Sequence, residues 1–251
     1  MILLFGLSVG SFINVLVDRI PKGESVVKGR SYCDSCRHQL SWTDLIPLLS
    51  FILLSRKCRY CSKKISYQYP LIEVTVGLVF LFTCVAIIQN KIVDYTTMIY
   101  IFGVTSALLT IFFIDFKYRI IPDEILIFLI LIALLKNIFL GSTTFGNYLV
   151  SAVIFFLFFL ILFIVTKGKG MGFGDVKFAF AIGLILGFPK VIIAFYLSFL
   201  TGALISLILI LVGKKKMKSS VAFGPFLSLG CYIALIYGDT LWKFIKAYLK
   251  I

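Results

Sequence analysis

Charged residues are scarce in this sequence, and acidic residues are the scarcest of all. Of the 251 residues only 14% are charged, against about a quarter in ordinary soluble domains, and only 11 are Asp or Glu. The chain is 61% hydrophobic, and its mean hydropathy is +1.07. Because a soluble core cannot bury this much apolar surface, the composition excludes one or two soluble domains and indicates a polytopic membrane protein.

The sequence also lacks internal repeats, and its apolar runs predict an all-α membrane protein with about eight transmembrane helices. The first run has neither a basic segment before it nor a small-residue cleavage site after it, so we interpret it as a retained anchor. The sixth run is short and contains Gly183, with Gly187 and Pro189 at its end, which favours a steep or broken helix that lines a polar site. The predicted spans are residues 1–17, 71–88, 97–114, 125–140, 148–166, 178–188, 191–212 and 221–238.

Basic residues predict the orientation in the membrane. Of the 25 Lys and Arg, 19 lie in loops 18–70, 115–124, 167–177 and 213–220, which share one side. By the positive-inside rule that side is the cytosol, so the amino terminus and the tail 239–251 lie outside. The tail is predicted to lie along the interface as a short amphipathic helix. The net charge of +14 is therefore an orientation signal and does not indicate nucleic-acid binding.

The main composition shift along the chain divides it into three parts. Residues 1–17 form the first transmembrane helix, residues 18–70 a small polar, cysteine-bearing cytosolic domain, and residues 71–251 the membrane domain. Within the cytosolic part, the stretch 45–54 is apolar but too short to span a bilayer, so we expect a membrane-surface or re-entrant hairpin.

The cysteines form two pairs, Cys33-x-x-Cys36 and Cys58-x-x-Cys61, with 21 residues between them. Four thiolates at this spacing suit tetrahedral zinc in a closed and therefore structural site. The alternative is two disulfides, which the reducing cytosol disfavours. His38 is expected to be a surface residue and not a ligand.

Two of the 11 acids stand out by their position. Asp115 closes the third predicted span and Asp175 opens the sixth, and the topology puts both at the cytosolic ends. Two carboxylates together in a partly dry site share one proton and act as general base and general acid on a water, which is the chemistry of an aspartic protease. The alternatives are that Asp175 caps its helix while Asp115 pairs with Lys117 or Arg119, or that both acids carry protons in a proton-coupled transporter.

Other residues near these acids have supporting roles. Gly172 and Gly174 flank Phe173 and are expected to allow positive φ and close approach of a peptide substrate's backbone. Asp123 follows Pro122 at the start of the fourth span, where we expect a structural residue that could also support the dyad.

These motifs together resemble the type IV prepilin peptidases, bifunctional leader peptidase/N-methyltransferases that are membrane aspartic proteases of the GxGD type. The resemblance follows the family order from residue 10 to residue 177, and the last third matches mainly in hydropathy. Besides the two cysteine pairs, the matching segments are Gly10-Ser11-Phe12-Ile13-Asn14-Val15, Arg19-Ile20-Pro21, Asp44-Leu45-Ile46-Pro47, Tyr69-Pro70-Leu71-Ile72-Glu73, Ile114-Asp115, Ile121-Pro122-Asp123 and Gly172-Phe173-Gly174-Asp175.

The resemblance implies a specific activity and location. Asp115 and Asp175 would be the catalytic pair, acting in a multi-pass protein of the bacterial inner (cytoplasmic) membrane with its active site facing the cytosol. The substrates would be prepilins or pseudopilins whose basic leader is cut after a glycine, so that the pilus or secretion assembly machinery is an indirect partner. The new amino terminus would then be methylated from S-adenosylmethionine, an activity associated with the cysteine loop. Glu73 could orient the amine in that step.

No glycine-rich dinucleotide-type fingerprint marks a site for the methyl donor. Two readings from other classes remain at this point. One is the proton-coupled transporter that uses Asp115 and Asp175, and the other is a non-catalytic assembly subunit with a structural zinc knuckle.

Overall fold

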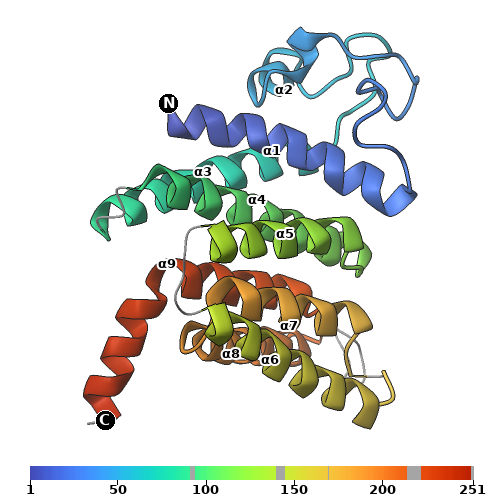
Figure 1. Cartoon of the computed structure of the whole chain (residues 1–251). Coiled ribbons are helices and arrows are strands. Elements are labelled where there is room, and N and C mark those ends of the chain that lie inside the picture. The colour runs from blue at the N-terminus through green and yellow to red at the C-terminus, as the bar shows by residue number, and fades with distance from the viewer. Residues whose placement is uncertain (91–93, 140–144, 169, 214–221, 250–251) are drawn as a thin grey trace. The chain divides into compact units, whose positions relative to one another are not determined.

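The computed structural model describes residues 1–251 except 91–93, 140–144, 169, 214–221 and 250–251, and this described part is all-helical apart from two isolated bridges between extended residues. Figure 1 labels the elements in chain order. They are α1 (Ile2–Arg19), η1 (Ile20–Lys22), η2 (Trp42–Leu45), α2 (Leu49–Leu53), α3 (Gln68–Gln89), α4 (Tyr95–Tyr118), α5 (Asp123–Phe139), α6 (Phe145–Val165), α7 (Phe173–Leu186), α8 (Lys190–Leu211) and α9 (Gly224–Leu249).

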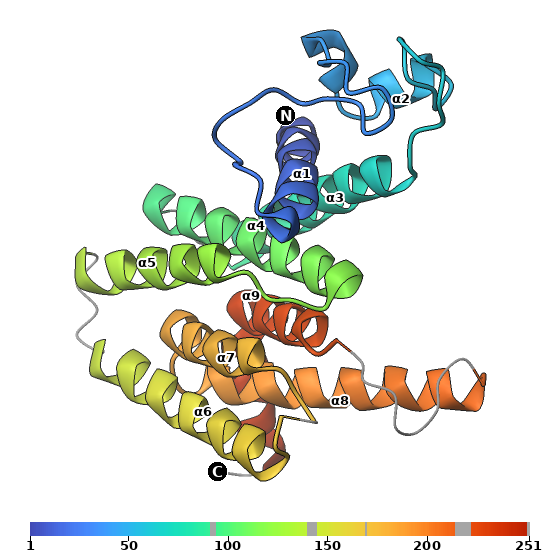
Figure 2. The same cartoon turned by 90° about the vertical axis from the view of Figure 1, so that its right-hand side faces the viewer.

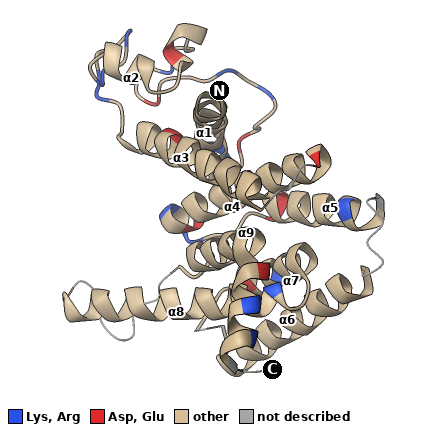
Figure 3. Cartoon of the chain, turned by 90° about the vertical axis from the view of Figure 1, so that its left-hand side faces the viewer, with Lys and Arg blue, Asp and Glu red and all other residues tan. Residues whose placement is uncertain are grey.

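Eight helices, α1 and α3 to α9, lie at the eight predicted span positions. Five of them are long and apolar enough to cross a membrane: the segments Ile2–Lys22, Gln68–Gln89, Tyr95–Tyr118, Phe145–Val165 and Lys190–Leu211. The helices α5, α7 and α9 are not among these five. Charged positions are sparse along the helical ribbons in Figure 3. The basic loop predicted at 213–220 lies almost wholly outside the described residues.

The chain divides into two compact units, Met1–Met98 and Ile99–Ile251. In the amino-terminal unit α1 and α3 pack closely, because glycines bring the two backbones together. A Cβ on Gly6 would lie 2.8 Å from the Cα of Gly77, and a Cβ on Gly10 would lie 2.7 Å from the Cα of Glu73. The predicted functional division into residues 18–70 and 71–251 stays a prediction, although α3 joins α1 and the cysteine loop in one unit.

In the carboxy-terminal unit α7 is the central helix. It contacts α5, α6, α8 and α9, and Figures 1 and 2 both show it within this group. Ten of its 14 residues are buried. Of the two expected forms, a steep or a broken helix, the broken one is wrong, because α7 runs unbroken to Leu186 and Gly183 lies against the backbone of Ala152 on α6.

The boundaries of α7 and α9 also differ from the predicted ones. α7 begins at Phe173 and not near residue 178, so Asp175 lies within its first turn, and Gly187 ends the helix with a φ of 62°. α9 continues without interruption into the tail as far as Leu249, and in Figure 1 its second half bends away from the first.

Candidate functional site

Asp115 lies in the last turn of α4 and is buried, with 5% of its surface exposed. Its Oδ2 accepts a hydrogen bond from the backbone N–H of Gly224, at an N–O distance of 2.9 Å. The helix continues through Asp115 to Tyr118, so the carboxylate projects from a regular turn and not from a frayed end.

Asp175 is the third residue of α7 and is 6% exposed. Its Oδ2 accepts the backbone N–H of Gly172, the residue before the helix, at 3.0 Å. The side chain therefore caps its own helix, as one of the sequence interpretations expected. Capping occupies one carboxylate oxygen and is compatible with a catalytic role for the other.

The fold brings Asp115 and Asp175 together, although 60 positions separate them in the chain. The two carboxylates are close enough that the charge of Asp115 acts on Asp175. Arg119 also acts electrostatically on Asp115, which partly agrees with the pairing alternative. Two buried carboxylates in this proximity can share a proton and serve as base and acid on a water.

Neither glycine of the Gly172-Phe173-Gly174 segment has a positive φ, so that expectation is wrong. Gly172 is extended, with φ −80° and ψ 156°, and its N–H is used by Asp175. Gly174 lies in the helix, where a Cβ would meet the Cβ of Ile121 at 3.1 Å. A role in contacting substrate stays a prediction for both, and the close neighbour at Gly174 is a side chain of this chain.

Asp123 begins α5 and forms an ion pair with Lys177 on α7, two residues after Asp175. Both side chains are partly exposed. The pair ties the start of α5 to the first turn of α7. Asp123 thus contacts the helix that carries Asp175 and, in the described hydrogen bonds, neither Asp115 nor Asp175.

The first cysteine pair sits in a tight turn. The N–H of Cys33 donates to the carbonyl of His38 at 3.0 Å, and the N–H of Arg37 donates to the carbonyl of Cys33 at 2.8 Å. Arg37 has a φ of 58°, and an isolated bridge joins Tyr32 to Gln39 across the turn.

The second pair repeats this turn position by position. The N–H of Cys58 donates to the carbonyl of Lys63 and the N–H of Ser62 to the carbonyl of Cys58, both at 2.9 Å. Ser62 has a φ of 57°, and a bridge joins Lys57 to Lys64. The two turns are therefore equivalent knuckles, each of which presents two thiols.

The four thiols of the knuckles converge. The Sγ atoms of Cys33, Cys36, Cys58 and Cys61 all lie within 4.8 Å of one another, and those of Cys33 and Cys61 are 3.9 Å apart. Four sulfurs bound to zinc at about 2.3 Å lie about 3.8 Å from each other, so the cluster fits a tetrahedral ion. All four cysteines are free thiols. Burial alone would raise the pKa of Cys33, but hydrogen bonds from the backbone of Cys36 and Ser35 and from neighbouring thiols lower it to about 7.

Asp44 on η2 holds the second knuckle in place. Its Oδ1 accepts Nε of Arg59 at 2.7 Å, and its Oδ2 accepts the hydroxyl of Tyr60 at 3.2 Å, two residues that lie between Cys58 and Cys61. Burial alone would raise the pKa of this carboxyl, but hydrogen bonds from Ser41, Arg59 and Tyr60 lower it below its ordinary value.

The same two halves of the chain match two protein-family models. Residues 4–87 match the bacterial peptidase A24 N-terminal domain, and residues 102–207 match the type IV leader peptidase family. The chain is 31% identical to a Bacillus subtilis (strain 168) protein over 242 residues, which cover 96% of this chain and 95% of that one. That relative is named prepilin leader peptidase/N-methyltransferase. This chain belongs to the type IV leader peptidase family.

Other members of the leader peptidase family are similar over the same extent. A protein of Aeromonas hydrophila with the same name is 30% identical over 271 residues, covering 97% of this chain and 92% of that one. One of Pseudomonas aeruginosa, also of that name, is 29% identical over 276 residues, covering 96% and 91%. No solved structure matches. Family membership and the five apolar helices make this chain a multi-pass membrane protein.

Glu73 of this leader peptidase family member lies on α3 and is 8% exposed. Its carboxylate accepts the N–H of Leu48 at 2.8 Å and a hydrogen bond from the side chain of Ser11. Glu73 thus joins α1, α3 and the start of α2. The short α2 leaves Ile52 and Leu53 68% and 72% exposed, and the expected membrane-surface or re-entrant hairpin stays a prediction.

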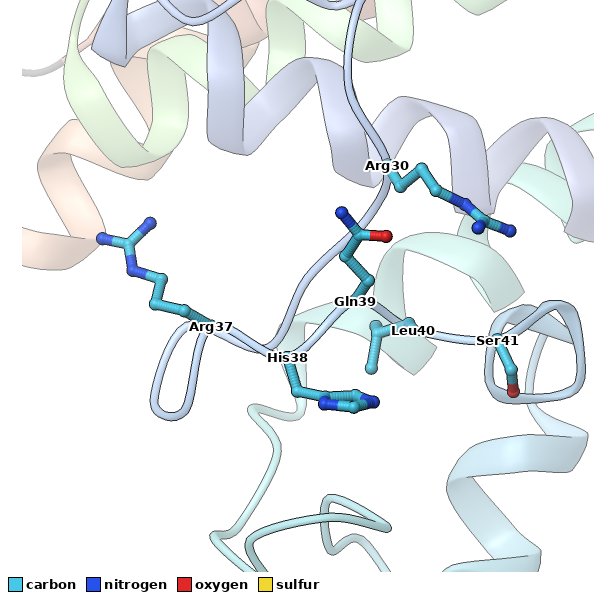
Figure 4. A pocket seen from close by; sticks show the side chains of 6 residues that line it. All are labelled: Arg30, Arg37, His38, Gln39, Leu40 and Ser41. Carbon is cyan, nitrogen blue, oxygen red and sulfur yellow. The ribbon is translucent and has the colours of Figure 1, made fainter.

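A cavity of about 540 Å³ lies beside the first knuckle and is lined by two arginines. Figure 4 shows Arg30 and Arg37 extending to opposite sides of it. No acidic side chain is among its described lining residues, which are Arg30, Arg37, His38, Gln39, Leu40 and Ser41. The lining therefore offers no carboxylate to pair with the positive sulfonium of S-adenosylmethionine. The exposed ring of His38 lies against the ring of Tyr60, with centroids 3.7 Å apart and planes tilted by 34°, and does not contribute to the thiol cluster.

Arg19 was noted in the sequence only as part of a matching segment, and Gly224 was missed altogether. Arg19 is 8% exposed and donates to the carbonyls of Ser25 and Arg30, both at 2.9 Å, which orders the chain that leaves α1. Gly224 contacts Asp115 from a segment 109 positions away. The signal available in the sequence was the Gly224-Pro225 pair at a helix start, where proline is favoured.

Proposed function

We propose that this chain is a prepilin leader peptidase that also N-methylates the new amino terminus of its product. The observation that carries the proposal is the convergence of two buried carboxylates, Asp115 and Asp175, in a member of the type IV leader peptidase family. The names of the relatives support both activities. The same observations favour a peptidase over a proton-coupled transporter.

The proposed cleavage uses the dyad as base and acid on one water. The ionised carboxylate takes a proton from the water, whose oxygen attacks the carbonyl carbon of the leader's last residue. The protonated carboxyl donates its proton to the carbonyl oxygen, which gives a tetrahedral diol. The amide C–N bond then breaks as the leaving amine takes the proton that the first carboxyl accepted from the water, and a diol hydroxyl returns a proton to the second carboxylate, which restores the dyad. Burial of both groups keeps this exchange in a site where electrostatic interactions are strong.

The amino-terminal unit is proposed to serve the methyl transfer. The four thiols would hold a structural zinc ion, since four protein ligands leave no open coordination position for chemistry. S-adenosylmethionine supplies the methyl group when bound. Glu73 is placed to organise this unit through its contacts with Leu48 and Ser11, and we propose that it orients the amine through that framework.

The proposed location is the bacterial inner membrane, with the amino terminus outside and the dyad at the cytosolic face. This orientation rests on the 19 of 25 basic residues assigned to one side. The substrates would be prepilins or pseudopilins, whose apolar helix lies in the bilayer while the basic leader lies in the cytosol. The pilus or secretion machinery then depends on the product and is an indirect partner.

The test is cleavage of a prepilin by purified full-length protein in lipid nanodiscs. We expect Asp115→Asn and Asp175→Asn each to abolish cleavage, because either change leaves only one ionisable carboxyl. The matched control is Asp239→Asn, an acid on α9 that pairs with Lys190 and is expected to cut normally. Cleavage by both dyad variants at the wild-type rate would refute the proposal.

A further inference from the structure

The first residue of α9, Gly224, is bonded to a catalytic carboxylate. Its backbone N–H donates to Oδ2 of Asp115 at 2.9 Å, and the bond is buried. Because Asp115 lies on α4, the contact joins the last helix of the chain to the dyad. The following inference rests on the proposed function of that dyad.

The hydrogen bonds at the start of α9 account for this bond. The first N–H groups of a helix have no partner in the helix. At α9 the second residue is Pro225, which has no N–H, and the N–H groups of Phe226 and Leu227 bond back to the carbonyl of Phe223 at 3.0 and 3.1 Å. Among these first four residues, Gly224 alone donates to a partner outside the segment, and that partner is Asp115.

Only glycine fits at this position. A Cβ on Gly224 would lie 2.6 Å from Oδ2 and 3.0 Å from Cγ of Asp115, well inside van der Waals contact. Any side chain would push the carboxylate away from the N–H. The glycine is therefore required by the close approach and not by its backbone angles.

Aromatic packing fixes the place of this N–H. The ring of Phe223, directly before Gly224, lies 5.1 Å from the ring of Phe199 on α8 and 6.3 Å from that of Phe159 on α6, between centroids. Gly202 on α8 leaves room for Phe226, since a Cβ there would meet the Phe226 ring at 3.3 Å. The start of α9 is thus held by an apolar cluster of three helices.

The two catalytic carboxylates are supported in the same way. Gly172 donates its N–H to one oxygen of Asp175, and Gly224 donates its N–H to one oxygen of Asp115. We propose that Gly224 is a positioning residue of the dyad, whose N–H fixes the Asp115 carboxylate so that its second oxygen can accept a proton from the water. The positive end of α9 also stabilises the ionised form of Asp115.

The test is Gly224→Ala in the full-length enzyme. We expect kcat for cleavage to fall about 100-fold with KM unchanged within about twofold, because a displacement of about 1 Å of a catalytic group costs this much while leader binding is untouched. The acid limb of the pH–rate profile should move to higher pH, since the ionised dyad loses a donor. Methylation of a pre-cut pilin peptide should stay at the wild-type rate, and thermal unfolding of the variant reports whether the carboxy-terminal unit is folded.

The matched control is Gly146→Ala, a glycine near the start of α6 where an added Cβ meets nothing within 4 Å. It should behave as the wild type. If Gly224→Ala does not fold, Phe223→Leu loosens the cluster while it keeps the N–H, and it should lower kcat by a smaller factor and move the acid limb the same way.

Wild-type kcat and an unchanged pH profile in folded Gly224→Ala would overturn the inference. A fall in kcat/KM that comes from KM alone would also overturn it. If Asp115→Asn also cleaves normally, the proposed peptidase dyad fails as well. If Asp115→Asn is inactive while Gly224→Ala is active, only the role of Gly224 fails.

Discussion

The two units of the chain build their candidate sites in opposite ways. In the amino-terminal unit, the four thiols come from two copies of one local turn, each completed by its own backbone hydrogen bonds. In the carboxy-terminal unit, the dyad and its support come from α4, α7 and α9, and the Asp115–Gly224 bond joins residues 109 positions apart. The first site depends on local geometry and the second on helix packing.

This difference predicts different sensitivities. A zinc knuckle is expected to lose its structure when a ligand is removed, because the free energy of metal binding contributes directly to its folding. A dyad assembled by packed helices is sensitive to substitutions in the apolar core that touch neither carboxylate, since α7 carries Asp175 and packs against four helices. The predictions below test whether damage stays within each unit.

The largest effect is expected from Cys58→Ser. Losing one of four thiolates should release the zinc and unfold the loop, so methylation of a pre-cut pilin peptide should fall below detection. Cleavage should stay within about threefold of wild type, because the dyad lies in the other unit and such a change is under 1 kcal/mol. Bound zinc, limited proteolysis and both activities would be measured on the same preparation.

The control for that experiment is Cys84→Ser, a half-buried cysteine on α3 outside the thiol cluster. It should keep zinc and both activities. An intact, protease-resistant loop in zinc-free Cys58→Ser would contradict the expectation that the loop depends on its four thiolates for its structure.

The second effect is expected from Gly183→Ala in the core of the carboxy-terminal unit. The added Cβ would lie 2.4 Å from the Cα and 2.6 Å from the N of Ala152 on α6, and backbone cannot move aside as a flexible side chain can. We expect a loss of about 3 kcal/mol in unfolding free energy together with a large loss of cleavage, because α7 must shift. Thermal unfolding and the rate of cleavage measure the two effects.

Gly103→Ala is the matched control for Gly183→Ala, since its nearest neighbour would be Cδ1 of Ile132 at 3.8 Å. It should leave stability and cleavage unchanged. Equal melting temperatures for the two variants would contradict the expected loss of stability. Equal cleavage rates would show that the dyad does not depend on the packing of α7.

The comparison also explains how much the sequence could predict. The knuckles were predictable because both cysteine pairs follow a fixed local spacing. The proximity of Asp115 and Asp175 was predictable because the chain has only 11 acids and the predicted topology puts these two at the same ends of their spans. The positive φ expected at Gly172 and Gly174 was wrong. A glycine can be required for a positive φ, for its N–H or for close packing, and the sequence alone does not show which of these applies. Gly224 was missed since its partner is 109 positions away, and no local pattern encodes that contact.

A smaller effect is expected from Asp44→Asn, which weakens the support of the second knuckle. The carboxylate has only 4% of its side chain exposed and accepts Arg59, but Arg59 is half exposed, so we expect a loss of about 1 to 2 kcal/mol in loop stability. Because the pKa of Asp44 is lowered from 3.8, the ionised carboxylate contributes its full stabilisation above pH 3.8. This stabilisation is lost only as the pH falls below 3.8. The difference between variant and wild type, measured by hydrogen exchange of the loop, should therefore stay constant from about pH 8 to pH 5. A difference that disappears by pH 5 would mean that the pKa is raised instead.

The smallest effect is expected from Asp123→Asn, which removes the ion pair with Lys177 beside the dyad. With 62% of the Asp123 side chain and 36% of the Lys177 side chain exposed, the pair should contribute roughly 0.5 kcal/mol, and kcat should stay within about twofold of wild type. Lys177→Gln should give the same small change, and the double variant should be no worse than either single one if the pair acts only as a tie between α5 and α7. The two single variants and the double variant would be compared by thermal unfolding and by cleavage rate. A drop of more than tenfold in kcat for Asp123→Asn with unchanged stability would instead place this acid in the catalytic apparatus. The dyad would then be supported by a surface ion pair as well as by the backbone N–H groups at the starts of α7 and α9.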